Sequence, residues 1–254
     1  MALVTTDAVI LHSFKYGESS KIVRLATAEL GVQSAIAKGA TRAKSRFGAR
    51  LQVLSEGVAQ IYVKQNRDLQ TLAEFDVVKQ RRELAHDVRR YAGGAALAEL
   101  VLRFSHSGPN PELFALLVRD LDNITSASPE ILDIVVLSAL WGAVCVLGFA
   151  PALDSCARDG ARLSDGAAVF SVTDGGFLCS TCSRGVSTRR LSGDDRLNLL
   201  ALVAGRLDEV GTITARHGAA HSRLLRDFVQ HHVSEGRELK ALAFWEDLVW
   251  TATS

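Results

Sequence analysis

Residues 38–50 read Lys-Gly-Ala-Thr-Arg-Ala-Lys-Ser-Arg-Phe-Gly-Ala-Arg, a segment with five basic side chains and no acidic one. One apolar run precedes it at residues 32–37 and another begins at Leu51. The pattern therefore predicts a basic connection between two strands of one small sheet. Clustered Lys and Arg neutralise phosphates and release counterions, which gives salt-sensitive binding to nucleic acids. A solvated loop whose charge serves only solubility fits the same pattern. The basic residues are Lys38, Arg42, Lys44, Arg46 and Arg50.

Apolar segments on both sides of this loop predict five strands, at residues 7–16, 21–25, 32–38, 51–64 and 69–78. Gly57 inside the fourth segment predicts a bulge or bend. Five short strands separated by turn residues are typical of a small closed barrel such as the OB-fold, since closure removes exposed strand edges. We therefore expect residues 1–80 to form an OB-fold domain that binds nucleic acid.

The spacing of apolar residues becomes helical beyond Arg81, which predicts an α-helical domain over residues 81–254. Residues 154–190 interrupt this pattern. Asp-Gly turns at residues 165–166 and 174–175 flank the apolar run 169–172 and predict a small hairpin. The expected fold class is α+β: a five-stranded OB-fold barrel, then a helical domain with an inserted zinc-knuckle-like hairpin.

Charge is distributed unevenly along the chain. Residues 1–82 hold 13 Lys and Arg against 7 Asp and Glu, a net charge of +6, whereas the remainder carries −5. A basic first third indicates that this part of the protein meets a polyanion.

Residues 134–153 form an uncharged run of twenty residues, the length of a bilayer span. Asp133 and Asp154 flank the run, and no Lys or Arg lies between Arg119 and Arg158. A spanning helix usually has basic residues near one end, so we expect a buried helix and no membrane association. With four cysteines and no signal peptide, the chain is expected in the reducing cytoplasm.

A C-x2-C pair, Cys179 and Cys182, supplies half of a tetrahedral zinc site. Cys156 stands upstream as a third thiolate, but the position three residues later is Asp159. A carboxylate oxygen is a weaker fourth ligand in a site of soft thiolates. A structural zinc ion held by these four residues and a hairpin that folds without metal are both consistent with the sequence.

No catalytic motif is present in the sequence, so we expect no enzyme activity. A zinc-dependent hydrolase would need an open metal position and a general base, and the sequence offers neither. His217 and His221 lie four residues apart but lack the Glu of a zincin helix.

Aromatic rings near the basic segment can stack on bases in a single-strand-binding barrel. Phe14 is expected in the core, whereas Phe47, between Arg46 and Gly48, is the ring expected to contact DNA. Lys21 and Arg24 are further candidate DNA-binding residues, although they lie on opposite faces of one strand.

Several segments together resemble the RecO family of bacterial recombination mediators. In the first third they are 16–23 (Tyr-Gly-Glu-Ser-Ser-Lys-Ile-Val), 35–40 (Ala-Ile-Ala-Lys-Gly-Ala) and 44–48 (Lys-Ser-Arg-Phe-Gly). Later matches are 153–156 (Leu-Asp-Ser-Cys), 175–179 (Gly-Gly-Phe-Leu-Cys) with Cys182, 228–232 and 238–242. The likeness covers nearly the whole chain and is loosest between Arg81 and Asp133. Asp159 stands where zinc-binding members of the family have a cysteine, so the resemblance leaves open whether this chain binds zinc.

The resemblance implies a non-catalytic protein that binds single- and double-stranded DNA and anneals complementary strands. It also implies that the protein, with RecR, helps load RecA on strands coated by single-strand-binding protein (SSB). The acidic C-terminal tail of SSB would need a groove with a basic rim, for which Arg223, Arg226 and Lys240 are candidates. A protein-interaction scaffold whose basic loop binds an acidic protein partner is the alternative.

Overall fold

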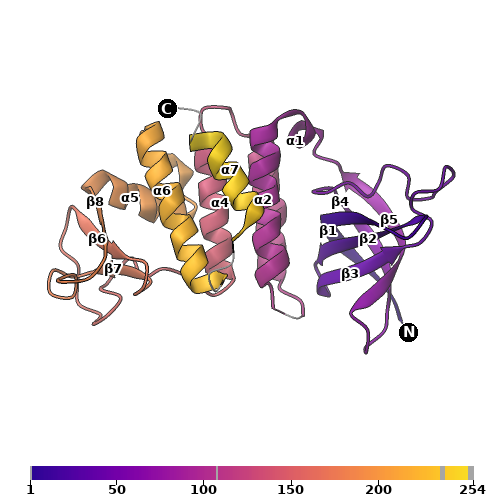
Figure 1. Cartoon of the computed structure of the whole chain (residues 1–254), viewed down its shortest axis with the longest axis horizontal. Coiled ribbons are helices and arrows are strands. Elements are labelled where there is room, and N and C mark those ends of the chain that lie inside the picture. Colours follow the sequence, from indigo (N-terminus) through magenta and orange to yellow (C-terminus); the bar gives the residue numbers. More distant parts are fainter. Residues whose placement is uncertain (1, 107, 235–237, 251–254) are drawn as a thin grey trace. The chain divides into compact units, whose positions relative to one another are not determined.

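The first third of the protein is a closed five-stranded barrel in the computed structural model, which describes residues 2–106, 108–234 and 238–250 (Figure 1). The strands pair in the order β1-β2-β3-β5-β4, β1 also pairs with β4, and β3 and β5 run parallel. This closure confirms the predicted barrel. Its strands are β1 (Ala2–Tyr16), β2 (Ser20–Thr27), β3 (Gly31–Ala37), β4 (Glu56–Val63) and β5 (Leu69–Lys79).

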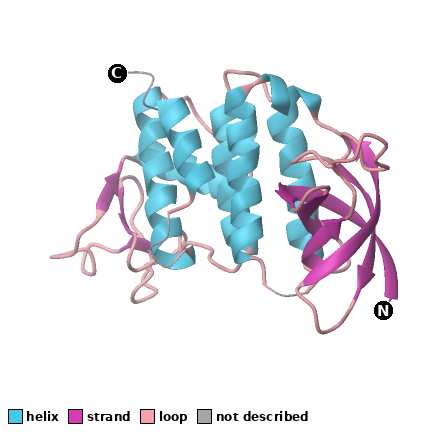
Figure 2. Ribbon diagram, turned by 45° about the vertical axis from the view of Figure 1, so that its right-hand side comes forward, coloured by secondary structure: helices cyan, strands magenta, loops and turns pink. Residues whose placement is uncertain are grey.

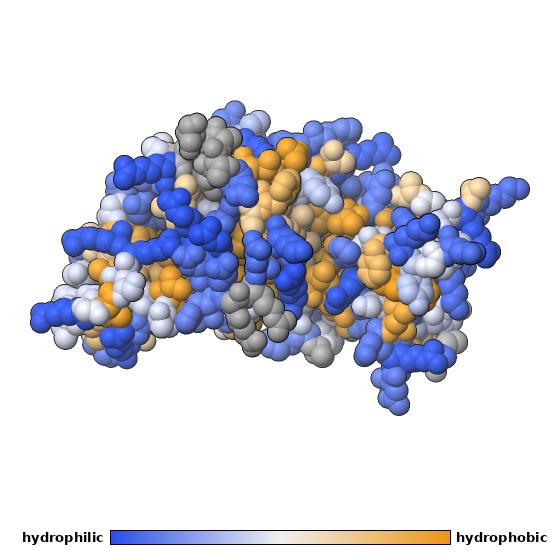
Figure 3. Space-filling view, in the orientation of Figure 1, coloured by the Kyte–Doolittle hydropathy of each residue, from blue (hydrophilic) through white to orange (hydrophobic). Residues whose placement is uncertain are grey.

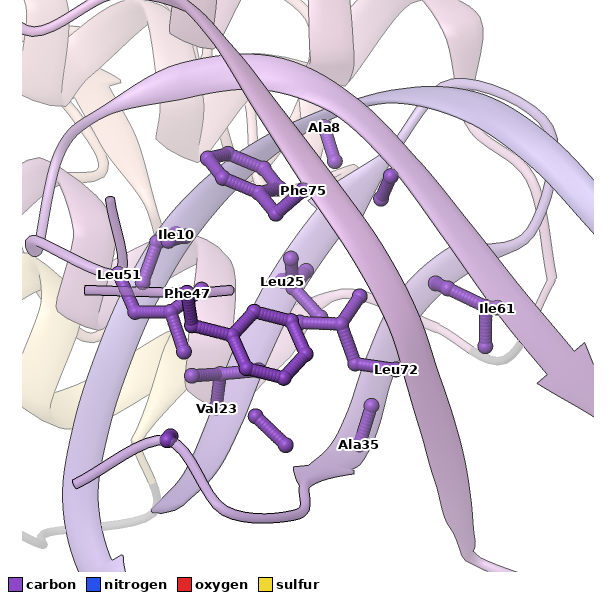
Figure 4. Packing of buried hydrophobic residues seen from close by; sticks show 13 residues of the cluster. Ala8, Ile10, Val23, Leu25, Ala35, Phe47, Leu51, Ile61, Leu72 and Phe75 are labelled. Atoms are coloured by element: carbon purple, nitrogen blue, oxygen red, sulfur yellow. The ribbon is translucent and has the colours of Figure 1, made fainter. Parts of the chain in front are cut away.

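Alternate residues of each strand point into the barrel, as the two-residue period of a strand requires. Figure 4 shows the resulting cluster of buried apolar side chains. Besides strand residues it contains Ala40, Phe47 and Leu51, which come from the connection between β3 and β4. This connection therefore closes one end of the barrel core.

The fourth strand is shorter than predicted, because β4 begins at Glu56 and residues 51–55 lie outside it. Leu54 adopts a left-handed conformation with φ 69°, which cannot continue a strand. The predicted irregularity at Gly57 is confirmed, since the register between β4 and β5 shifts between Glu56 and Gly57. A Cβ on Gly57 would lie 2.3 Å from the carbonyl oxygen of Asp76, so only glycine fits there.

Three helices complete the first of two compact units, which extends to residue 126. They are α1 (Arg82–His86), α2 (Val88–Phe104) and α3 (Pro111–Ser126). Gly94 lets α2 approach the barrel closely, because a Cβ there would lie 2.9 Å from the Leu54 side chain. The secondary structure thus changes from strands to helices near residue 80, but the first compact unit also includes α1, α2 and α3.

Arg81 joins the barrel to these helices within the first unit. Its side chain is 0% exposed and forms ion pairs with Glu56 at the start of β4 and with Asp122 on α3. It also donates a hydrogen bond to the Leu54 carbonyl at 3.2 Å. Burial of a charge is tolerated only with such partners.

The second unit, from residue 127, is mostly helical (Figure 2). Its helices are α4 (Leu132–Val146), α5 (Gly193–Ala204), a 3-10 turn at Leu207–Glu209, α6 (Ala215–Phe228), a π-helical turn at Val229–Val233 and α7 (Lys240–Trp250). In α4, apolar residues are buried around most of the helix, including Trp141 at 0% exposure. Among the described residues, no helix is sufficiently long and apolar to cross a bilayer.

The expected interruption in the helical pattern is a three-stranded sheet in the order β7-β6-β8. Its strands are β6 (Ala168–Ser171), β7 (Gly176–Leu178) and β8 (Arg189–Leu191). The predicted hairpin is the pair β6 and β7, and β8 adds a third strand. The overall α+β class is therefore as predicted.

Candidate nucleic-acid interface and metal centre

The basic loop, defined as residues 38–50, follows β3 at one end of the barrel. Thr41 attaches it to the turn between β1 and β2, because its N–H donates to the Ser19 carbonyl at 3.0 Å and its hydroxyl to the Glu18 carbonyl at 3.3 Å. Backbone bonds inside the loop, such as Arg50 N–H to the Phe47 carbonyl at 2.8 Å, form successive turns. The loop therefore has a defined shape on the barrel.

Phe47 and Phe14 are both located contrary to the sequence-based expectation. Phe47 is 1% exposed, and its ring lies between Val23 and Leu72 in the barrel core (Figure 4). Phe14 is 43% exposed. The polar neighbours of Phe47 suggested a surface ring, but the loop folds over the open end of the barrel and inserts this side chain. A buried ring cannot stack on a base, so Phe47 anchors the loop instead.

All five basic side chains of the loop are exposed. Arg50 pairs with Asp76 at 3.2 Å. Within the described part of the chain, the other four form no ion pair with a carboxylate: Lys38, Arg42, Lys44 and Arg46. Their positive charge is therefore available to an external anion.

Lys21 and Arg24 lie on opposite faces of β2, as predicted. Lys21 shares the inward face with Val23, opposite Ala37, and so lies at the end of the barrel where the basic loop begins. Arg24 points outward, next to His12 on β1. The structure thus brings Lys21 to the loop and leaves Arg24 on the outer surface of the sheet.

The four predicted metal ligands meet at one point in the second unit. The sulfur atoms of Cys156, Cys179 and Cys182 and a carboxylate oxygen of Asp159 all lie within 4.8 Å of one another. Asp159 Oδ2 lies 3.2 Å from Cys182 Sγ and 3.5 Å from Cys179 Sγ. Around a tetrahedral zinc ion, an oxygen and a sulfur ligand are about 3.5 Å apart. The residues therefore fit zinc.

Neighbouring groups hold these ligands in place. The Ala161 N–H donates to Asp159 Oδ1 at 3.0 Å, which leaves Oδ2 directed at the thiols. Arg158 donates to the Cys182 carbonyl at 3.1 Å and pairs with Asp174 at 2.9 Å in the turn between β6 and β7. The roles of Arg158 and Asp174 were not predicted, since their pairing depends on how the hairpin folds.

The proton distribution in the cluster follows from these contacts. A hydrogen bond from Cys156 lowers the pKa of Asp159, so this carboxyl is ionised. The Asp159 carboxylate raises the pKa of Cys182 to about 12, whereas the Cys182 N–H lowers the pKa of Cys179. Zinc coordinates thiolates, so binding must displace the proton of Cys182. Four protein ligands would leave a bound zinc ion no open position, which is typical of a structural site.

The second unit has a cavity of about 410 Å³ that is lined by residues of α6, the π-helical turn and α7. Arg226, one of the residues suggested for an acidic peptide, is among the lining residues. Arg226 already pairs with Glu246 and Asp227, both at 3.3 Å. Glu238 and Asp247 also line the cavity. This cavity is therefore acidic and unsuited to an acidic tail. The other two suggested residues, Arg223 and Lys240, are exposed.

Comparison with known proteins gives one consistent result. Residues 1–81 match the family described as "Recombination protein O N terminal", and residues 85–242 match "Recombination protein O C terminal". Two proteins named "DNA repair protein RecO", from Anaeromyxobacter dehalogenans (strain 2CP-C) and a Nocardioides species, are each 33% identical to this chain. The first alignment covers 98% of both chains, and the second covers 96% of this chain and 99% of the relative. A relative of the same name from Bacillus pumilus is 30% identical over 71% of this chain.

Proposed function

This chain belongs to the RecO family of non-enzymatic recombination mediators, and we propose that it binds single- and double-stranded DNA through the basic loop of its barrel. The observation that carries the proposal is the group of four exposed cationic side chains without carboxylate partners among the described residues. Lys21 lies beside the loop and extends the basic surface. Arg50 contributes at its edge, and Arg24 is a further candidate contact on the outer surface of the sheet.

Such a site binds phosphates and leaves the base edges free, which annealing of complementary strands requires. Neutralisation of phosphate charge also lowers the repulsion between two strands that approach each other. The protein would therefore bind and position DNA without making or breaking a covalent bond.

We assign the contacts with protein partners to the helical domain, residues 81–254. In this proposal RecR and the C-terminal tail of SSB dock there, and the complex assists RecA loading on SSB-coated DNA in the cytoplasm, at the nucleoid. The exposed residues Arg223 and Lys240 are better suited to an acidic tail than Arg226, which already pairs with two carboxylates. A structural zinc ion at Cys156, Asp159, Cys179 and Cys182 would hold the hairpin insertion, residues 154–190, in shape.

Salt-dependent binding to a single-stranded oligonucleotide tests the DNA-binding proposal. The double variant Lys44→Ala, Arg46→Ala should bind several-fold more weakly at moderate salt. Its log–log salt slope should be shallower by about 0.7 for each lost phosphate contact. The matched control is Lys64→Ala, Arg67→Ala, which removes the same charge. These residues follow β4 at the end of the barrel where β1 begins, opposite the basic loop.

An equal loss of DNA affinity in both double variants would indicate only a general effect of net charge. If the unmodified protein fails to bind DNA but captures an acidic protein through the loop, the scaffold alternative is correct. Annealing of complementary strands with and without SSB then tests the mediator activity itself.

A further inference from the structure

Three aromatic rings form an exposed row on the outer face of β1. Ser13 pairs with Val23, whose side chain is in the barrel core, so the residues on either side of Ser13 point outward. We call His12, Phe14 and Tyr16 the aromatic strip. Phe14 is 43% and Tyr16 is 51% exposed, and the ring centroids of His12 and Phe14 are 5.6 Å apart. Exposed rings that lie next to one another on one strand face mark a candidate binding surface.

The strip begins where the buried part of β1 ends. Earlier on β1, Val9 and Leu11 are buried, and α2 packs against this strand within the first unit. The pairing of β1 with β2 is irregular between Ile10 and His12, and beyond this point the outward residues are exposed. Figure 3 shows that hydrophobic side chains reach the surface of the barrel among hydrophilic ones.

Neighbouring strands provide a partly apolar and cationic setting for the strip. Ile22 on β2 lies opposite Phe14, with Ile36 of β3 opposite Ile22. Arg24 lies opposite His12, and its Nε is buried without a hydrogen-bond partner among the described residues. A surface with flat rings along its centre and a guanidinium at its edge matches the bases and the phosphates of one nucleic-acid strand.

The strip also joins the basic loop. Tyr16 is the last residue of β1, and the turn that follows accepts the hydrogen bonds of Thr41 from the loop. A strand whose phosphates lie on the loop can therefore continue along β1.

The geometry points to the aromatic strip as a base-stacking site for single-stranded nucleic acid. This inference rests on the proposed DNA-binding function and refines it, because stacking requires bases that are not already stacked in a duplex. The loop then binds both forms of DNA through phosphates, while the strip favours single strands. It also provides the stacking that the buried Phe47 cannot.

Equilibrium binding of the protein to an oligothymidylate and to a duplex of the same length tests the inference. Phe14→Ala should weaken single-strand binding by roughly fivefold or more, the effect of losing one stacked base. Its duplex affinity and salt slope should stay unchanged, since no phosphate contact is removed. Tyr16→Ala should behave likewise, whereas Tyr16→Phe should retain affinity because the ring remains.

Tyr62→Ala is the matched control. Tyr62 is an exposed ring on β4 that pairs with Leu3, near the start of β1 and far from the basic loop. Its removal should change neither affinity. Thermal unfolding checks that each variant is folded, which is expected because none of the substituted rings is buried.

Single-strand affinity that is unchanged in Phe14→Ala and Tyr16→Ala would overturn the stacking site, as would an equal loss for duplex and single strand. Loss of binding in the Lys44→Ala, Arg46→Ala variant alongside normal binding in the strip variants would leave the proposed function intact. If the unmodified protein binds neither form of DNA, the proposed function itself fails.

Discussion

The guanidinium carbon of Arg46 lies 5.2 Å from the centroid of the Phe47 ring, although Arg46 is exposed and Phe47 is 1% exposed. Of these two adjacent residues, Arg46 thus faces the solvent and Phe47 lies in the barrel core. The buried ring holds the loop against the barrel, and the cation beside it remains available to a phosphate. Substitution of Phe47 should therefore change the stability of the first unit, and substitution of Arg46 should change only the charge of the loop.

Phe47→Ala should destabilise the first unit by about 3–5 kcal/mol, the usual cost of removing a buried phenyl ring. Arg46→Ala should change the free energy of unfolding by less than about 0.5 kcal/mol, because the side chain is at the surface. Urea unfolding of both variants checks this difference. Similar stabilities would show that the loop does not close the barrel core.

Arg81 and Lys79 both pair with Asp122 but differ in burial. Arg81→Met should cost about 3–5 kcal/mol, since Glu56 and Asp122 lose a fully buried partner. Lys79→Met should cost at most about 1 kcal/mol, because its 2.7 Å pair with Asp122 is exposed to water. Denaturant unfolding measures both values, and equal costs would refute a special role for the buried guanidinium.

In the proposed zinc site, Asp159 is the ligand expected to limit the affinity for the metal. Asp159→Ala removes a ligand and should weaken zinc binding by more than the roughly 10- to 100-fold seen when supporting partners are lost. Asp159→Cys should strengthen binding, since a fourth thiolate suits zinc better than a carboxylate here. Competition with a chromophoric chelator gives the affinities, and Asp154→Ala, an exposed acid in the same segment, is the control. Identical affinities in all variants would exclude Asp159 as a ligand.

His221 makes the stability of the second unit depend on pH. The residue is 2% exposed, and burial lowers its pKa below the ordinary value near 6.5, although Asp195 lies 3.5 Å away and opposes the shift. The unfolded chain gains a proton near pH 6.5 that the folded protein takes up only at lower pH. The free energy of unfolding should therefore fall as the pH drops below about 6.5, by at most about 1.4 kcal/mol per pH unit.

Urea unfolding at pH 7.5 and pH 5.5 measures this dependence. His221→Gln should reduce it strongly. His217→Gln should reduce it less, because burial is the largest cause of the lowered His221 pKa and the charge of His217 is a smaller one. An unchanged dependence in His221→Gln would assign the proton uptake to other groups.

Periodic patterns allowed much of the fold to be predicted. Alternating apolar residues identified the five barrel strands, and the Asp-Gly turns identified the pair β6 and β7. The spacing of Cys156, Asp159, Cys179 and Cys182 identified a ligand cluster that the structure brings within 4.8 Å. Each of these features depends on residues close together in the chain or on a repeated pattern, so local chemistry was sufficient.

The sequence by itself therefore determined the α+β class, the position of the basic loop and the composition of the cysteine cluster. Only the tertiary structure decided which aromatic side chains are buried. Phe47 has polar neighbours along the chain but enters a core built from strands distant in sequence, while Phe14 lies on a strand with buried apolar residues but is itself exposed. The physical reason is that burial depends on what packs against a side chain in space, and neighbours in sequence do not specify this.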